Sequence, residues 1–423
     1  MQAFTPGIAP DAARVVAARA IRGFADGFVS VLLAQYLTGI GFSPVQVGAI
    51  ITGTLLGSAL LTLAFGFSTP RLTLRALLIT ATVMMVFTGV GFATIRWFWP
   101  LLLIAIVGTL NPSSGDVSAF LPTEQALITS HVETSRRAWL FARYNLAAIV
   151  AAALGALASG VPEALAHWQD WNVADAQQAS FLVYAAAGVV VFAMYRGLRR
   201  DHETLPSPSR QARRRVLHTS RRTVLELAGL FSIDAAGGGF VVTSLLVLWL
   251  HLRFDLSAGT TAAVFFAAGL LGGASQLLAP RVANRVGLIR AMTFTHIPAS
   301  VLLMLAAFAP SGGVAIALLL VRALFAQMDV PARQAFVMAV VPPDERAAAA
   351  SVTNVPRSLA AAATPLLAGA LLARSTFGWP LLIAGTAKIV YDVALLVLYR
   401  NVAEQPGAAR RVQKAPSGTD TAP

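Results

Sequence analysis

Residues 196–222 read RGLRRDHETLPSPSRQARRRVLHTSRR and form the only long polar interruption between an apolar run that begins near Val15 and one that ends near Tyr399. The stretch contains nine Arg against two acids. Pro206 and Pro208 oppose a regular helix in its middle, and so polar a segment cannot bury a core. We therefore interpret it as a solvated linker between two apolar halves.

The composition of the whole chain is typical of a membrane protein. Hydrophobic residues make up 57% and charged residues 12%, with a mean hydropathy of +0.69, whereas about a quarter of a soluble domain is charged. The net charge of +13 comes almost wholly from Arg, because Lys388 and Lys414 are the only lysines. Since these Arg flank apolar runs, we expect anionic lipids at the cytoplasmic face as partners, and no nucleic acid.

Twelve apolar runs are each long enough, at about twenty residues, to cross a bilayer as a helix. Six precede the linker, at 15–39, 45–67, 74–93, 98–121, 138–160 and 178–198. Six follow it, at 224–250, 258–280, 288–309, 313–337, 349–372 and 378–399. The sequence therefore predicts an all-α polytopic protein with a six-helix bundle in 1–198, a basic linker in 199–222, a second six-helix bundle in 223–400 and a disordered tail in 401–423.

Loop charge predicts the orientation. Arginine is concentrated in the N-terminal arm, in alternate loops, in the linker and in the tail, which the positive-inside rule assigns to the cytoplasm. The loop at 161–177 contains acids but no Lys or Arg and is expected outside. We expect a multi-pass protein of the bacterial inner membrane with both termini cytoplasmic.

The two halves share a sequence pattern at a constant offset of 209 residues. The matching segments are Pro122-Thr123-Glu124-Gln125 with Pro331-Ala332-Arg333-Gln334, Arg137 with Arg346, Asn145 with Asn354, and Gly160 with Gly369. Asp26 and Asp234 correspond more loosely. The chain is therefore predicted to be two copies of a six-helix unit, an arrangement that one class of secondary transporters uses to place a solute site between the halves.

Motifs in both halves resemble the major facilitator superfamily over essentially all twelve helices. Residues 341–347, Val-Pro-Pro-Asp-Glu-Arg-Ala, followed by Pro365 and Gly369, are similar to the family's loop and eleventh helix. The family's cytoplasmic motif Gly-x-x-x-Asp-Arg-x-Gly-Arg-Arg is represented by Gly66, Arg71 and Arg75. The drug-antiporter signature Gly-Pro-x-x-Gly-Gly lacks its Pro in the fifth helix.

The resemblance implies a secondary active transporter of a small solute that works by alternating access as a monomer. We expect proton coupling, with export slightly favoured over uptake. A facilitative uniporter and a non-transporting sensor or scaffold with the same fold are the alternatives. No cofactor or metal is expected, and no enzyme activity, because the sequence has no phosphate-binding Gly-rich loop, no metal-ligand spacing of histidines and no Gly-x-Ser-x-Gly elbow.

Charged side chains inside membrane helices cost roughly 2.5–3.5 kcal/mol each on insertion scales, so they mark functional candidates. Asp116, Phe120 and Glu124 are spaced four apart and share a helix face. Asp116 has no cation within one turn and is the preferred proton-titrating carboxylate. The candidates for solute or proton coupling are Asp26, Asp116, Glu124, Asp234, Asp329 and Arg333.

Two further sets complete the predicted cavity. The uncharged polar candidates are Gln125, Asn145, Gln334 and Asn354. The gating or latch candidates are Arg71, Arg75, Arg137, Arg143, Arg285, Arg346 and Arg357.

Several roles stay open at this point. Arg333 and Glu124 can meet across the cavity, either as a latch between the halves or as solute contacts. Arg22, one turn before Asp26, can simply neutralise it. We interpret Lys388 and Asp392, four apart on the last helix, as structural, and His296 beside Pro298 as a packed polar residue rather than a proton relay.

Overall fold

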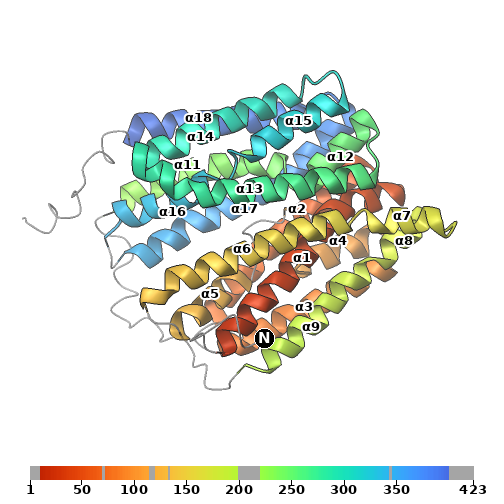
Figure 1. The fold of residues 1–423 in the computed structure, drawn as a ribbon, viewed down its shortest axis with the longest axis horizontal. Coiled ribbons are helices and arrows are strands. Elements are labelled where there is room, and N and C mark those ends of the chain that lie inside the picture. Colours follow the sequence, from red (N-terminus) through yellow and green to blue (C-terminus); the bar gives the residue numbers. More distant parts are fainter. Residues whose placement is uncertain are drawn as a thin grey trace, which may run out of the picture.

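The computed structural model describes residues 10–68, 72–113, 120–131, 134–198, 220–342 and 345–399, and every regular element in these ranges is an α-helix. The first half contains α1 (Pro10–Gly39), α2 (Pro44–Ser68), α3 (Leu74–Thr94), α4 (Phe98–Val107), α5 (Phe120–His131), α6 (Thr134–Ala158), α7 (Val161–Trp168), α8 (Val173–Ala179) and α9 (Phe181–Arg196). The second half contains α11 (Arg221–Phe240), α12 (Thr243–Phe254), α13 (Ala258–Val286), α14 (Leu288–Ala306), α15 (Gly312–Ala323), α16 (Asp329–Val340), α17 (Arg346–Arg374) and α18 (Trp379–Tyr399). Figure 1 shows the two groups of helices one above the other.

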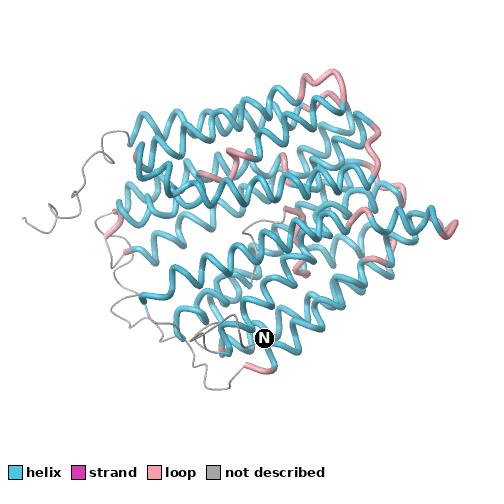
Figure 2. The backbone as a smooth tube through the Cα atoms, in the orientation of Figure 1, coloured by secondary structure: helices cyan, strands magenta, loops and turns pink. Residues whose placement is uncertain are grey.

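Long apolar helices run through both halves. Nine stretches of the described chain are long and apolar enough to cross a membrane, and α4 and α15 are two shorter apolar helices. Helices are present at all twelve predicted crossings, which confirms the all-α fold of two six-helix units. Figure 2 shows the helices running alongside one another, with loops mostly at the two ends of the bundle. The chain is an integral multi-pass membrane protein.

Three of the predicted helices are interrupted, which corrects the continuous helices expected at 98–121, 224–250 and 313–337. In the fourth crossing α4 ends at Val107, shortly before Asn111 and Pro112, and a Pro has no N–H for the helical ladder. In the seventh crossing the break between α11 and α12 follows three consecutive glycines. In the tenth, residues 324–328 form turns without any Pro or Gly.

Side-chain caps and left-handed residues define several helix ends. Thr73 accepts a hydrogen bond from the Ala76 N–H at the start of α3, and Ser257 does the same for Thr260 at the start of α13. Gly287, with φ of 89°, separates α13 from α14 in a conformation that favours glycine. Between these ends, the long helices pack through their apolar faces.

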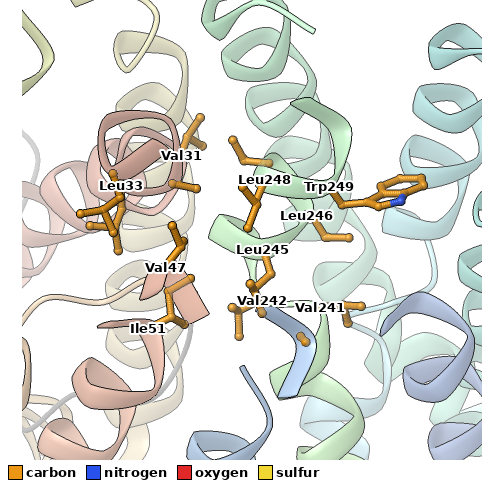
Figure 3. Packing of buried hydrophobic residues seen from close by; sticks show 14 of the residues in the cluster. Val31, Leu33, Val47, Ile51, Val241, Val242, Leu245, Leu246, Leu248 and Trp249 are labelled. Atoms are coloured by element: carbon orange, nitrogen blue, oxygen red, sulfur yellow. The ribbon is translucent and has the colours of Figure 1, made fainter. Parts of the chain in front are cut away.

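An apolar core joins the two halves. Val31 on α1 and Val47 on α2 belong to the same buried cluster as Leu245 and Leu248 on α12. Figure 3 shows these side chains, drawn from helices of both halves, facing one another. The halves therefore meet through α1, α2 and α12 without an intervening polar layer at this point.

Candidate functional site

Small residues allow close helix contact between the halves. A methyl group on Gly48 of α2 would lie 2.5 Å from the Pro365 carbonyl oxygen of α17, and one on Gly160 would lie 3.1 Å from the Gly259 Cα of α13. Along the same pair of helices, a methyl group on Gly269 of α13 would lie 3.1 Å from the Ala153 Cβ of α6. Substitution at these positions would push the two halves apart.

Polar contacts add to this packing between the halves. Gln35 near the end of α1 donates from Nε2 to Thr261 Oγ1 of α13 at 2.6 Å. The Glu163 carboxylate of α7 accepts from the backbone N–H of Ala258, the first residue of α13, at 2.9 Å. All of these residues lie where α1 ends and α13 begins, which is the end that the loop charges assign to the outside.

The start of α12 donates hydrogen bonds to backbone carbonyls of the first half. Ser244 at the start of α12 donates from Oγ to the carbonyl oxygens of Ser30 at 2.6 Å and Pro112 at 3.2 Å. Its backbone N–H also donates to Pro112 at 3.3 Å. Pro112 lies in the break of the fourth crossing, and Ser244 gives its carbonyl two donors.

A first charge cluster lies inside the first half and consists of Arg22, Asp26, Glu124, Tyr144 and Tyr195. Arg22 Nη2 lies 2.5 Å from Glu124 Oε2, and both side chains are almost completely buried. The hydroxyls of Tyr144 and Tyr195 also donate to the Glu124 carboxylate. Glu124 is thus held by three donors from α1, α6 and α9.

Two further residues in the first half surround Asp26. Its carboxylate is hydrogen-bonded by the Asn111 side chain from the break in the fourth crossing and lies within electrostatic range of Arg22 and Arg19. The Arg19 guanidinium stacks 5.4 Å from the centre of the Tyr144 ring. Arg22 therefore interacts with Asp26, as expected, but its direct ion pair is with Glu124.

A second charge cluster lies inside the second half and consists of Asp234, His296, Asp329, Arg333, Lys388 and Asp392. Lys388 Nζ lies 2.7 Å from Asp234 Oδ1, and Arg333 Nη1 lies 3.1 Å from Asp234 Oδ2. Arg333 also pairs with Asp329 at 3.2 Å. His296 Nδ1 lies 3.0 Å from Asp392 Oδ2. All six residues are buried.

The expected contact between Glu124 and Arg333 across the cavity does not form in this structure. Glu124 is bound by Arg22, and Arg333 by Asp234 and Asp329, so that each side chain pairs within its own half. Each half therefore pairs these helix charges within itself. This corrects the cross-half geometry that the repeat offset alone had suggested for these two residues.

The other predicted candidates are dispersed. Asn145, Asn354 and Gln334 are exposed and Gln125 is half-buried. Among the arginines, Arg75 donates to the backbone carbonyls of Tyr195 and Arg196 in its own half, Arg143 and Arg357 are half-buried, and Arg285 is exposed. Asp116, Arg71 and the side chains of Arg137 and Arg346 lie outside the described residues.

The partners of His296, Lys388 and Asp392 are what sequence reasoning does not supply. The sequence favours a structural role for Lys388 and Asp392, four apart on α18, and a packed polar role for His296. In the structure Lys388 binds Asp234 of α11 and Asp392 binds His296 of α14. The available signal was the cost of placing three ionisable side chains in two apolar helices.

The described residues contain no group of three or more His, Cys, Asp or Glu with a geometry suited to a metal ion. The acidic side chains of both clusters instead pair with the basic and hydroxyl side chains around them. The arrangement is suited to charge pairing and proton transfer between side chains.

Comparison with known proteins identifies the same fold. The chain is 24% identical over 416 residues to the uncharacterized membrane protein YJR124C of Saccharomyces cerevisiae, covering 90% of this chain and 92% of the relative. The structure of a bacterial homolog to the human lysosomal transporter Spinster, in an inward-facing and unoccupied conformation, matches with a TM-score of 0.68 at 14% identity, covering 95% of this chain and all of that chain. The nucleoside transporter NupG matches with a TM-score of 0.66 at 11% identity, covering 93% of this chain and all of that chain.

A family model matches a large part of the sequence directly. It covers residues 15–327, which include the linker and helices of both halves, and it describes the Major Facilitator Superfamily. The bacterial inner membrane stays a prediction, since the named relative is a yeast protein. The chain is a membrane transporter that belongs to the Major Facilitator Superfamily.

Proposed function

We propose that this protein is a secondary active transporter that moves a small solute by alternating access and couples its movement to protons, with export as the preferred direction. The observation that carries the proposal is the distribution of contacts between the halves. Glycine packing and side-chain hydrogen bonds join them near the end where α13 begins and at the interrupted helices, and a joint of this kind can open without breaking an ion pair.

The two charge clusters support the coupling part of the proposal. Each half keeps its buried acids paired within itself, so that a rocking motion of one half against the other leaves both clusters intact. Asp26, Asp234 and Asp329 are buried acids on α1, α11 and α16. A bundle that only held a fold or sensed a signal would gain nothing from these costly groups.

The contacts near the start of α13 also favour a particular state. That end is predicted to face outward, so these contacts favour a conformation that is closed to the outside. The similar Spinster homolog structure is in an inward-facing conformation. The domain boundaries and cytoplasmic termini belong to this proposal, because the linker at 199–219 lies outside the described residues.

Flux in proteoliposomes tests the proposed function. The purified protein is reconstituted, and uptake and release of a panel of labelled solutes are measured with and without a pH gradient, in both membrane orientations. A transported solute that accumulates only with the gradient supports the proposal. Equal flux without a gradient indicates a uniporter, and no flux for any solute favours a non-transporting sensor.

A matched pair of variants makes this assay specific. Asp26→Asn removes a buried charge from α1 and is expected to abolish gradient-driven accumulation. Asp255→Asn removes a charge from a residue whose side chain is 98% exposed and whose φ of 51° suits Asn equally well. Normal accumulation in this control, combined with loss in Asp26→Asn, separates coupling from a general effect of charge.

A further inference from the structure

The side chains of the second charge cluster form a connected path through four helices. Starting at α18, Asp392 contacts His296 of α14, whose Nε2 lies 3.4 Å from Lys388 Nζ of α18. Lys388 binds Asp234 of α11, and Asp234 binds Arg333 of α16. The path therefore runs from a helix pair at one side of the half to α11, which continues into α12 at the joint between the halves.

The charges of this cluster do not balance without an added proton. Asp234, Asp329 and Asp392 contribute three negative charges, whereas Lys388 and Arg333 contribute two positive charges. With a neutral His296 the cluster carries a net charge of −1. A buried net charge without compensation is costly, and one proton on the His296–Asp392 pair would remove it.

The geometry around His296 accommodates both protonation states. In the neutral ring, Nδ1–H donates to Asp392, whose two oxygens lie 3.0 and 3.1 Å away, and Nε2 accepts from Lys388. In the protonated ring, Nε2–H can no longer accept from Lys388, but Asp234 Oδ1 lies 3.7 Å from it. Gain of a proton therefore sets His296 and Lys388 in competition for the same Asp234 oxygen.

This competition has a route to the joint between the halves. Asp234 lies on α11 shortly before Gly237, whose added methyl group would meet the Lys388 side chain at 3.2 Å. The helix is then interrupted at residues 241–242, and Ser244 beyond the interruption binds the first half. A change in the bond between Lys388 and Asp234 thus acts on the segment that leads into the joint.

From this charge count and geometry we infer that His296, held by Asp392, is the proton-binding site of the transporter, and that loading it weakens the bond between Lys388 and Asp234. The inference deepens the proposed proton coupling and rests on it for its functional meaning. It moves the titrating group from the cavity-facing acids to a His–Asp pair between α14 and α18. Histidine is the side chain that ordinarily changes charge near physiological pH.

The surroundings of His296 define what else acts on its titration. From α18 it faces Asp392, Lys388 and Tyr391, whose ring centre is 6.1 Å away. From α11 it faces Asp234, through which Arg333 and Asp329 of α16 also act. The Tyr391 hydroxyl is buried and has no hydrogen-bond partner among the described residues, so it offers a nearly isosteric control.

Nuclear magnetic resonance of the full chain in lipid nanodiscs tests the site without any transport assay. The protein contains 6 His, so selective ¹⁵N-histidine labelling gives few signals. The His296 signal is identified by its loss in His296→Gln and followed from pH 5 to pH 8.5. His167, whose side chain is 72% exposed, gives a comparison signal from outside the cluster.

The expected result is a His296 signal that titrates within this range with Nδ1 protonated in the neutral form. Asp392→Asn should move the midpoint to lower pH by about one unit or more, because it removes the adjacent negative charge, and Lys388→Gln should move it to higher pH. Tyr391→Phe should leave it unchanged. A ring in one protonation state throughout, or a midpoint insensitive to Asp392→Asn, would overturn the inference.

The flux assay and this titration fail independently. Proton-driven flux with a His296 that does not titrate would sustain the proposed function and refute the site. If His296 titrates but the flux does not depend on the pH gradient, proton coupling is refuted. His296 would then bind a proton without driving transport. A His296 midpoint that shifts with sodium concentration at constant ionic strength would contradict a site reserved for protons.

Discussion

Glu163 offers a quantitative test of how the two halves are joined. Its carboxylate accepts a hydrogen bond from the first N–H of α13 at 2.9 Å, and its side chain is only 23% exposed. Acceptors at a helix N-terminus contribute about 0.5–2 kcal/mol, and a negative charge there adds roughly 0.3–1 kcal/mol. Glu163→Ala removes both contributions, so the joint should weaken by roughly 1–3 kcal/mol, which corresponds to about a 5- to 150-fold higher population of the outward-open state.

A graded series separates the two contributions. Glu163→Gln keeps an acceptor oxygen and loses only the charge, so that its effect should be about two- to fivefold. Asp170→Asn is the matched control, because it removes a charge from the same loop at a residue with φ of 53°, which Asn also adopts. It should leave the population unchanged.

The chain contains no Cys, so a single introduced thiol reports opening without background. Ala262→Cys places it on α13, where the native side chain is 1% exposed and a methyl group on Gly160 would be 3.3 Å away. Its rate of labelling by a membrane-impermeant maleimide added outside should rise in the order Asp170→Asn, Glu163→Gln, Glu163→Ala. Equal rates in Glu163→Ala and Asp170→Asn would refute the role of this contact.

Three other outcomes follow from the same structure and sequence. Asp116→Asn should keep gradient-driven accumulation, measured in proteoliposomes, because the proton site is inferred at His296; loss of accumulation with solute exchange intact would return the coupling to Asp116. Glu124→Gln should lower the free energy of unfolding by about 3–5 kcal/mol, because it removes the charged partner that the buried Arg22 contacts directly; thermal unfolding with Arg22→Gln added should show partial recovery, while the exchange Glu124→Arg with Arg333→Glu should show none. Reporter domains fused after residue 200 are expected in the cytoplasm and those inserted within 163–175 outside, and protease accessibility of an external linker would overturn the orientation.

The sequence predicted the fold class because the length of the apolar runs and the constant repeat offset can be seen in the sequence without knowing which side chains touch. The break near Pro112 has a local signal that the continuous helix expected at 98–121 did not take into account, since Pro acts on its own backbone. The break at residues 324–328 has no Pro or Gly, and no sequence signal marks it.

Pairing inside the clusters was beyond sequence reasoning. Arg22 and Glu124 are separated by 102 positions, and His296 and Asp392 by 96. Which of several buried acids meets which cation depends on the rotation and tilt of each helix, and small changes in either exchange the partners. The offset of 209 placed Glu124 and Arg333 at equivalent positions, but equivalent positions in two units need not touch.

The backbone carbonyls at the interrupted helices have a consequence for hydration. The Pro112 carbonyl, in the break of the fourth crossing, accepts hydrogen bonds from Ser244 of the opposite half, and a carbonyl within the depth of a bilayer needs a partner at all times. When the halves separate there, solvent must take the place of Ser244, so that the gap wets as it forms. Osmotic pressure from an impermeant polymer should therefore slow the opening, in proportion to the number of waters that enter.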